Sequence, residues 1–449
     1  MRNIMKAIEQ AGGSPFMVGG CVRDQLMGIV PKDIDIEVFN LSSDKLIEVL
    51  KTFGKVDQVG VSFGVIKLKT DKDDYDFSLP RRENKEGRGH KGFQVEVDHT
   101  LSPLEAALRR DFTMNAVSID MDGNVVDPLG GIGHIHARRL VATSPKFAED
   151  PLRVLRGMQF AGRFDMRMNK ATIELCKSIF HEADTIAIER INTEIVKWAT
   201  KSIKPSRGIE VLVKTGWISL FPELECLVGL GQDPTYHPEG DVLTHTALVC
   251  DAAADIATRD VLSDSDRLVL VLAALCHDLG KATTTIVDEQ GKIRSPKHAQ
   301  EGVAPTRSLL ERMGFQESVI SKVVPLVSCH MDHLGVRANK TFVRRLSKRV
   351  TPSSIAQLVR LMEADRSGRP PLPKKCPEVA LDILRISSEL DISNNQPIPI
   401  LMGRHLIELG VQPSPEFSKL LGLAFEAQLD GEFDDLDGAI LFVKMLINT

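Results

Sequence analysis

The chain has 449 residues, of which 43% are hydrophobic and 26% charged, with a formal net charge of −5. This length exceeds what one hydrophobic core needs and predicts two to four domains. No apolar run approaches the ~18 residues of a membrane span, and the first residues lack a signal-peptide core. Seven scattered cysteines without a CxxC pair are typical of a reducing compartment, so we expect a cytoplasmic protein without a membrane partner.

The first 128 residues alternate helix and strand patterns. An amphipathic helix is predicted at residues 4–11, and a short apolar run then ends at Gly19 and Gly20. Glycine pairs bring backbone N–H groups close to a phosphate, and Arg23, one helical turn further on, reaches the same anion. The segment therefore predicts a phosphate-binding turn that leads into a helix.

Acidic residues follow this turn at every second position. Asp33, Asp35 and Glu37 alternate with aliphatic residues, which is typical of a half-buried strand. Asp33 and Asp35 then point the same way, and a cation between them relieves their repulsion. Mg²⁺ favours a few carboxylates combined with substrate phosphates. We predict a triphosphate and magnesium site, whereas a solvated acidic strand is the alternative that a lone DxD favours.

Two further strands are predicted at residues 65–69 and 75–79, and a helix is predicted from Ser42 or Ser43 to Phe53. Asp76 in the second strand is either a third carboxylate that faces the acidic pair or an exposed strand residue. The charged, glycine-rich segment 81–92 has no periodicity and predicts a long functional loop that repositions the reacting ends.

Adjacent arginines mark the next junction. Arg109 and Arg110 end a predicted helix and precede a predicted strand at residues 117–121. They suit a sugar and phosphate contact, while basic residues facing a helix dipole are the alternative that this segment alone favours. Residues 127–131 break the pattern and predict a hinge at the end of the sheet domain.

From residue 146 onwards the pattern is helical. Pro151 opens a helix that carries Asp150, Arg153 and Arg156 on one face. Acceptors and donors fixed side by side suit the Watson–Crick edge of a base, whereas intrahelical ion pairs are the alternative. Residues 138–214 contain 15 Lys and Arg against 9 Asp and Glu, which fits either a phosphate-tracking surface or solvated helix faces.

The second half contains a separate set of histidines and aspartates. Its members lie in different predicted helices or at their ends, and the His-Asp pair ends a strongly apolar helix: His245, His277, Asp278, His298, His330 and Asp365. Such residues bind one or two divalent metal ions, which activate water for phosphate ester hydrolysis. After a proline-rich linker at residues 370–373, helices without a chemical motif are predicted.

Together these motifs resemble those of the bacterial class II tRNA nucleotidyltransferases, the CCA-adding enzymes, in the form that carries an HD domain. Five motifs match in order over nearly the whole chain: residues 19–35, 109–116, 127–131, 149–156 and 189–194. The resemblance implies an α/β, polymerase-β-like nucleotidyltransferase head at residues 1–137. It also implies an all-α neck and RNA-binding region at 138–232, an HD phosphohydrolase domain at 233–370 and a helical tail at 371–449.

The resemblance further implies template-independent addition of C, C and A to tRNA from CTP and ATP. The implied roles in the head are catalysis and Mg²⁺ binding by Asp33 and Asp35, triphosphate binding by Gly20 and Arg23, sugar and phosphate support by Arg110 and Arg156, and base selection by Asp150 and Arg153. In the HD domain the implied ligands of a divalent transition metal are His245, His277, Asp278 and Asp365, with His298 and His330 for a second ion. This domain would hydrolyse phosphorylated RNA ends or nucleotides.

One position departs from the family pattern. The base-reading helix of the family often has a third arginine where this chain has Gln159, so a triphosphate contact would be lost or rearranged. The alternatives are a poly(A) polymerase, an enzyme that adds only CC or only A, and an HD phosphohydrolase with an RNA-binding head. The acidic C-terminal segment disfavours the first, and the intact Asp33 and Asp35 pair disfavours the last.

Overall fold

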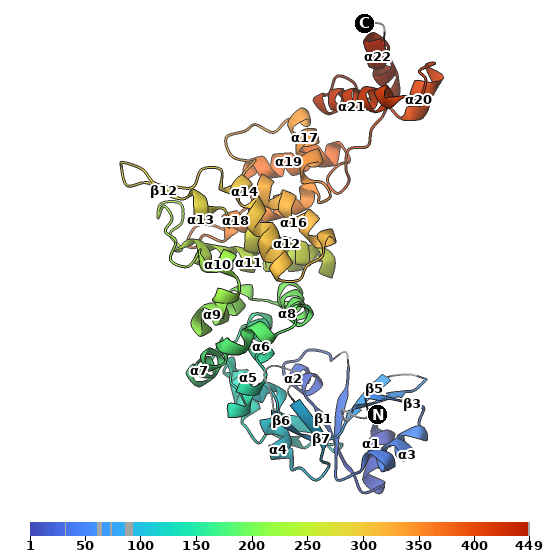
Figure 1. Ribbon diagram of the computed structural model, residues 1–449, viewed down its shortest axis with the longest axis vertical. Helices are drawn as coiled ribbons and strands as arrows, with labels where there is room; N and C mark the ends of the chain where they lie inside the picture. Colours follow the sequence, from blue (N-terminus) through green and yellow to red (C-terminus); the bar gives the residue numbers. More distant parts are fainter. Residues whose placement is uncertain (32, 61–64, 72–73, 86–92, 448–449) are drawn as a thin grey trace. The chain divides into compact units, whose positions relative to one another are not determined.

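The computed structural model describes residues 1–31, 33–60, 65–71, 74–85 and 93–447 (Figure 1). It divides into two compact units, Met1–Leu220 and Phe221–Thr449. The first unit contains a mixed sheet and helices, and the described regular secondary structure of the second is helical apart from one short hairpin, β12 (Ile286–Val287) and β13 (Ile293–Arg294). No described helix has the length and apolarity of a membrane span. The predicted fold class, α/β followed by all-α, is confirmed.

A seven-stranded sheet organises the head. Its strand order is β3-β4-β5-β2-β1-β8-β9, with β2 and β5 parallel and the other neighbours antiparallel. The strands are β1 (Ser14–Val18), β2 (Asp35–Phe39), β3 (Lys55–Gly60), β4 (Val65–Lys69), β5 (Asp74–Ser78), β8 (Ser118–Ile119) and β9 (Val125–Val126). The central strand β2 begins at Asp35, the second residue of the predicted acidic pair. The pair therefore lies at the edge of the sheet where β2 starts.

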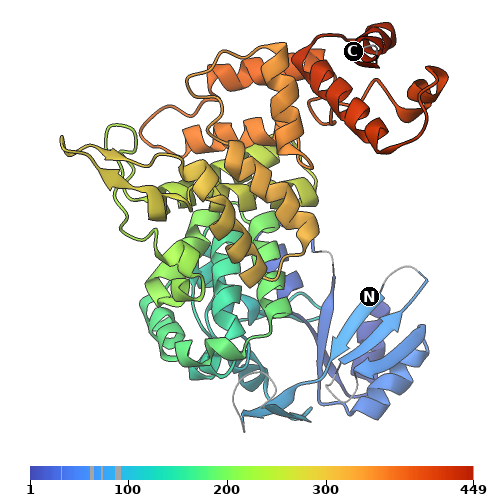
Figure 2. The ribbon, with the colours of Figure 1, turned by 45° about the horizontal axis from the view of Figure 1, so that its top comes forward.

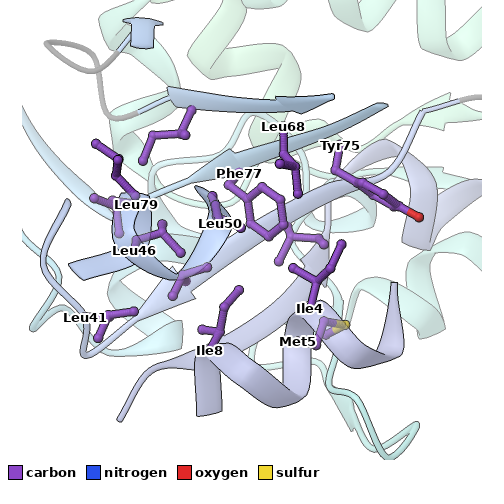
Figure 3. Close-up of a cluster of buried hydrophobic side chains, with 14 residues drawn as sticks. Ile4, Met5, Ile8, Leu41, Leu46, Leu50, Leu68, Tyr75, Phe77 and Leu79 are labelled. Carbon is purple, nitrogen blue, oxygen red and sulfur yellow. The ribbon is translucent and has the colours of Figure 1, made fainter. Parts of the chain in front are cut away.

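One face of this sheet is covered by α1 (Arg2–Gln10) and α3 (Ser43–Lys51), both close to their predicted ranges. Figure 3 shows Ile8 of α1 and Leu46 and Leu50 of α3 pointing towards Phe77 of β5. All four are completely buried. Burying such side chains contributes roughly 1.5–3 kcal/mol each. This core fixes the register of β2 against β5 and thereby the positions of the polar residues on these strands.

The predicted loop at residues 81–92 is partly wrong. Residues Arg81–Lys85 form β6, which pairs antiparallel with β7 (Phe93–Val97), and residues 86–92 lie outside the described part of the chain. The guanidinium Nε of Arg82 donates to Asp98 Oδ2 at 2.7 Å. This segment forms a strand although it is charged and lacks periodicity. The partner strand β7 satisfies its backbone hydrogen bonds, and the carboxylate of Asp98 pairs with Arg82.

The same unit contains further helices, of which α4 (Pro103–Leu108) precedes the last two strands of the sheet and the others follow them. They are α4, α5 (Gly131–His136), α6 (Leu152–Phe164), α7 (Lys170–Ser178), α8 (Ile188–Lys201) and α9 (Pro205–Thr215). Both α8 and α9 pack against α6, as the green helices of Figure 1 show. A Cβ at Gly208 would lie 2.8 Å from the carbonyl oxygen of Met158, so glycine permits the close approach of α9 to α6. These neighbours hold α6, the helix with the predicted base-reading residues.

The second unit is built around a packed group of helices, α11 (Val242–Arg259), α12 (Asp264–Cys276), α16 (Glu317–Cys329) and α18 (Ile355–Ser367) (Figure 2). Helix α12 is buried from Val269 to Cys276 because neighbours surround it. A helix that is apolar on all sides belongs inside a protein. It therefore delivers the residues after its last turn, His277 and Asp278, to the interior.

Candidate functional sites

A polar cavity of about 580 Å³ lies in the first unit, lined by α2 (Gly20–Leu26), the beginning of β2, the end of β5 and the beginning of α6. All residues predicted for the head site line it except Asp33: Gly20, Arg23, Asp35, Arg110, Asp150, Arg153 and Arg156. Asp33 is exposed just before β2. Residues separated by more than 130 positions in the sequence thus meet in one cavity.

Carboxylates gather at the start of β2. Asp35 stands directly opposite Asp76 of the parallel strand β5, and Asp33 precedes it by two residues. Burial raises the pKa of Asp35, and the charges of Asp76 and Asp33 raise it further, while Arg110 opposes this shift. Asp76 therefore faces the acidic pair, although it also contacts Lys67 at 3.4 Å. Oxygen ligands whose mutual repulsion is unrelieved fit a divalent cation.

Arg110 is held against this strand by a buried glutamate. Its Nη2 donates to Oε2 of Glu37 at 2.9 Å, and Glu37 is only 4% exposed. A Cβ at Gly19, whose φ is +73°, would lie 3.0 Å from Nη1 of the same guanidinium. Glycine is thus required at position 19 both for its backbone conformation and for space. Glu37 was predicted only as part of the strand pattern, and its pairing with Arg110 was missed.

Arg156 is held by Asp111, which sequence reasoning did not select. Its Nε and Nη2 contact Asp111 Oδ2 at 2.8 and 2.7 Å, and Asp111 Oδ1 accepts from Nδ2 of Asn115 at 2.8 Å. Burial by itself raises the pKa of Asp111, but Arg156 and Asn115 outweigh it and lower the pKa. Both Asp111 and Asn115 belong to the second matched motif, and this match was the sequence signal that could have identified them as site residues.

Arg23 lies in the cavity wall with its charge already paired. Nη2 contacts Asp24 at 2.6 Å, Nη1 donates to Asn115 at 2.8 Å, and the guanidinium lies over the rings of Phe160 and Phe164. The side chain is 5% exposed. Asn115 contacts both Asp111 and Arg23. The sheet side and the α6 side of the cavity are therefore joined by one hydrogen-bond network.

The predicted base-reading residues have separate partners. Asp150 Oδ2 accepts from Arg190 Nη2 of α8 at 3.1 Å. Arg153 donates to the carbonyl oxygens of Lys146 and Arg109, both at 2.8 Å. Of the alternative interpretation, the N-terminal carboxylate is present, since Asp150 Oδ1 accepts from the backbone N–H of Leu152 at 3.0 Å, whereas the described contacts include no ion pair between Asp150 and Arg153. Arg190 also lines the cavity and was missed as a site residue, although its motif was matched.

Gln159 points away from the cavity. It is 1% exposed, and its Nε2 has no hydrogen-bond partner among the described residues. It is also absent from the cavity lining. The position where the family often has an arginine is therefore part of the packed side of α6 in this chain.

The histidines and aspartates of the second unit also converge. Two groups made of the predicted residues have ligand atoms within 4.8 Å of one another: His245, His277 and Asp365, and Asp278, His298 and His330; a third such group joins His245 to His237 and Glu239. The members of the first two groups come from α11, the end of α12, α14 (His298–Glu301), the end of α16 and α18. All six predicted residues are brought together, and they divide into two adjoining triads. Nitrogen and oxygen donors in this number fit one or two divalent metal ions.

Three of these histidines are oriented in the same way. Nδ1 of His277, His298 and His330 donates to the carbonyl oxygen three residues earlier, at 2.7–2.8 Å. Because Nδ1 carries the proton, the Nε2 lone pair of a neutral ring faces the site. Nε2 of His277 is buried and lies 3.1 Å from Oδ2 of Asp278, which also forms an ion pair with Nζ of Lys281 at 2.8 Å. Such an arrangement of donor atoms fits a metal ion.

His245 is oriented by a carboxylate instead. Its Nδ1 lies 2.7 Å from Glu239 Oε1, and its Nε2 lies 3.1 Å from Asp365 Oδ1. Burial by itself lowers the pKa of His245, but the hydrogen bonds to Asp365 and Glu239 outweigh it and raise the pKa to about 9. Glu239 also accepts from His237 Nδ1 at 2.9 Å. Sequence reasoning missed Glu239 because it lies outside the helices that carry the other residues.

A cavity of about 800 Å³ opens beside this cluster. Asp278, His298 and Asp365 line it together with five cationic side chains, Lys281, Arg294, Arg366, Arg369 and Lys375. Nε of Arg369 is buried without a hydrogen-bond partner among the described residues. Cations around a metal-binding cluster favour an anionic ligand such as a phosphate.

A mixed sheet with carboxylates beside an arginine-lined cavity, joined to a helical unit with a His and Asp cluster, defines a nucleotidyltransferase with an HD domain. In agreement, residues 15–141 match the poly A polymerase head domain and residues 242–366 match the HD domain. The multifunctional CCA protein of Xylella fastidiosa (strain M23) is 35% identical over 370 residues, covering 79% of this chain and 84% of the relative. That of Pasteurella multocida (strain Pm70) is 36% identical over 310 residues, covering 68% and 70%. The chain belongs to the family of multifunctional CCA proteins.

Solved structures show the same fold. The CCA-adding enzyme of Bacillus stearothermophilus in complex with CTP has a TM-score of 0.66 at 19% identity, covering 100% of this chain and 96% of the other. The Thermotoga maritima CCA-adding enzyme complexed with tRNA has a TM-score of 0.61 at 19% identity, covering 99% and 94%. The resemblance inferred from the five motifs is thereby confirmed.

Proposed function

We propose that the head of this chain adds C, C and A to the 3′ end of tRNA from CTP and ATP without a nucleic-acid template. The observation that carries the proposal is the cavity that joins Asp35 to the fixed arginines Arg110 and Arg156. The names of the relatives support it, as do the similar structures that contain CTP, ATP or tRNA.

The reaction follows from these side chains. The 3′-oxygen of the RNA attacks the α-phosphorus of the nucleotide, and pyrophosphate leaves. Mg²⁺ bound by Asp33 and Asp35 would supply charge neutralisation on the transferring phosphate and alignment of the 3′-hydroxyl. Arg110 and Arg156 bind the phosphates and sugar from positions set in advance by Glu37 and Asp111, so little reorganisation accompanies the reaction. Gly20 and Arg23 form the triphosphate wall of the cavity.

Base selection would fall to Asp150 and Arg153. Arg153 uses two N–H donors on carbonyl oxygens, and a guanidinium has five, so donors remain for a base edge. Asp150 offers carboxylate oxygens next to them, and Arg190 fixes its orientation. A pair of one acceptor and one donor group suits the Watson–Crick edges of both cytosine and adenine.

A length assay tests the head. A tRNA transcript without its last three nucleotides is incubated with the protein, Mg²⁺ and CTP, ATP or both, and the product length is read at nucleotide resolution. Growth by three with both nucleotides and by two with CTP alone is expected. Arrest at two with both would indicate a CC-adding enzyme, and a long ladder with ATP alone a poly(A) polymerase. No growth would overturn the assignment of Asp33 and Asp35.

A second activity is favoured by the two triads of the second unit. We infer a phosphohydrolase that acts on phosphorylated RNA ends or nucleotides, with a divalent transition metal held by His245, His277, Asp278 and Asp365 and a second ion near His298 and His330. Bound metal would supply an activated water molecule. The test is release of phosphate from 3′-phosphorylated RNA and from mononucleotides by protein loaded with Mn²⁺, Co²⁺ or Ni²⁺, with metal content measured in parallel.

The working division of the chain follows from these sites. We propose a head at residues 1–137, a neck and RNA-binding region at 138–232, an HD domain at 233–370 and a tail at 371–449. The seven cysteines are unpaired in the structure, which supports a cytoplasmic enzyme.

A further inference from the structure

Four arginines gather around a second, smaller cavity of the first unit, in the basic segment that begins at residue 138. Arg139 of β10 (Arg139–Leu140) stands directly opposite Arg167 of the parallel strand β11 (Arg167–Met168), and both are exposed. Arg138 and Arg207 complete the group, which we call the arginine ribbon. Together with Ala137 and Asp165 the four line a cavity of about 270 Å³.

The acidic residues near the ribbon neutralise only part of it. Asp165 contacts Arg138 Nη1 and Arg207 Nε, both at 2.9 Å, and Arg207 also pairs with Glu210 at 3.0 Å. Arg139 and Arg167 form no ion pair with any residue that the structure describes. Like charges in register across two strands are destabilising. An external anion between them would remove that cost.

The fold keeps these two guanidiniums at the surface. Leu140 and Met168, the next residues of each strand, are 0% and 8% exposed and anchor the strand pair in the core. Successive side chains of a strand point to opposite faces, so burial of these two residues turns Arg139 and Arg167 outward. The ribbon therefore presents two exposed forked donors, Arg139 and Arg167, on strands that are anchored in the core, and such donors bind phosphate oxygens bidentately.

Helix α6 relates the ribbon to the nucleotide cavity. Arg153 and Arg156 line the nucleotide cavity from its first turns, and Asp165 of the ribbon is its C-cap residue. A helix of 13 residues is roughly 20 Å long at ~1.5 Å per residue. This length is comparable to several base-pair steps of a duplex stem.

We propose that the arginine ribbon binds the phosphodiester backbone of the double-stranded stem of the RNA whose 3′ end occupies the head cavity. The proposal rests on the proposed function of the head, because that function supplies the RNA. The ribbon adds affinity and orientation for any stem of suitable shape, since phosphate contacts carry no sequence information.

The test uses the full chain with Arg139→Ala and Arg167→Ala combined. The matched control combines Lys45→Ala and Lys51→Ala, which removes the same charge from exposed positions of α3. At about 0.1 M salt we expect roughly tenfold weaker tRNA binding by fluorescence anisotropy, and a slope of log affinity against log salt that is smaller by about two. The control should change neither quantity, and thermal unfolding confirms that both variants are folded.

Kinetics with two acceptors separate the ribbon from the catalytic cavity. With tRNA the ribbon variant should raise KM for RNA and leave kcat and the KM for CTP unchanged. With a single-stranded acceptor too short to reach the ribbon, variant and wild type should be equal. Replacing both arginines by lysine should restore most of the salt slope, because charge remains, but only part of the affinity.

Two results would overturn the proposal: unchanged tRNA affinity and salt slope, or a raised KM for CTP in place of that for tRNA. Failure of the head function is distinguishable from both. If the wild type adds no nucleotides but binds tRNA with the expected dependence on Arg139 and Arg167, the ribbon is supported and only the proposed reaction is wrong.

Discussion

The cavity of the head and the histidine cluster of the second unit hold their charged groups differently. In the head, Arg110 and Arg156 keep 24% and 33% of their side-chain surface exposed, and Asp33 is exposed as well. In the cluster, His245 and His277 are fully buried and Asp278 is 2% exposed. Both sites border a cavity, but the head leaves its charged side chains partly exposed, whereas the cluster groups are already buried against one another.

The difference lies in what fixes each group. The head arginines are held by single carboxylates at one edge, which leaves further donors free for a nucleotide. The cluster histidines are held from behind by carbonyl oxygens or by Glu239, so their remaining nitrogens face one another. A metal site needs such preorganisation, whereas a site that accepts two nucleotides and an RNA end needs adaptable polar contacts.

The largest effect is expected from removing the carboxylate of Asp35 in the head. Asp35→Ala should lower nucleotide incorporation about a thousandfold, equivalent to about 4 kcal/mol, because Mg²⁺ loses a ligand. Single-turnover incorporation with saturating tRNA measures it. Asp44→Ala on the exposed side of α3 is the control and should be neutral. An active Asp35→Ala enzyme would disprove the catalytic assignment.

An equally direct change addresses the other site. Asp278→Asn should abolish stoichiometric binding of transition metal and lower phosphohydrolase activity by at least about a hundredfold. The reason is that the buried Asp278 carboxylate contacts three histidines of the cluster. CCA addition by the same preparation should remain normal. Metal analysis after dialysis and phosphate release are the measurements. Asp382→Asn on α19 (Glu378–Glu389) serves as the control. Retained metal in Asp278→Asn would contradict the ligand set.

A smaller effect is expected from the residue behind His245. Glu239→Ala should weaken metal binding about 10- to 100-fold, because residues that orient a ligand typically contribute this much. Competition with a chelator gives the affinity. Glu239→Gln retains an acceptor and should lie between the two, and exposed Glu408→Gln should match wild type. Unchanged affinity in Glu239→Ala would show that His245 needs no carboxylate.

Asp111→Asn tests whether Asp111 positions Arg156 for nucleotide binding in the head. Loss of the charge that holds Arg156 should lower kcat/KM for CTP about tenfold and destabilise the first unit by about 2 kcal/mol. Incorporation kinetics and denaturant unfolding measure the two effects. Exposed Asp122→Asn is the control. If stability falls and kcat/KM does not, Arg156 has no role in nucleotide binding.

The smallest effect is expected at Gln159. Gln159→Leu removes a buried amide without a described partner, so stability should be unchanged or higher by about 1 kcal/mol, with unchanged activity. The same assays apply. A clear loss of nucleotide addition would place Gln159 in the working site and contradict its position on the packed side of α6.

Sequence by itself determined the features that lie within one element or one turn. The spacing of Arg153 and Arg156 places them on one side of a helix, and the apolar run before His277 and Asp278 places this pair at the end of a helix. Asp150, which was expected on the same helix, lies in extended backbone just before it. These inferences need only the helical period and the polarity of neighbours. The five ordered motifs added the family, which the comparisons confirmed.

Tertiary structure alone decided which distant groups meet. Asp76 faces Asp35 because β2 and β5 pair in parallel with that register. Arg110 reaches Glu37 across 73 positions, and Arg156 reaches Asp111 across 45. Strand 81–85 forms because β7 pairs with it. Such contacts depend on how cores pack and sheets register, and no local period in the sequence encodes these long-range choices.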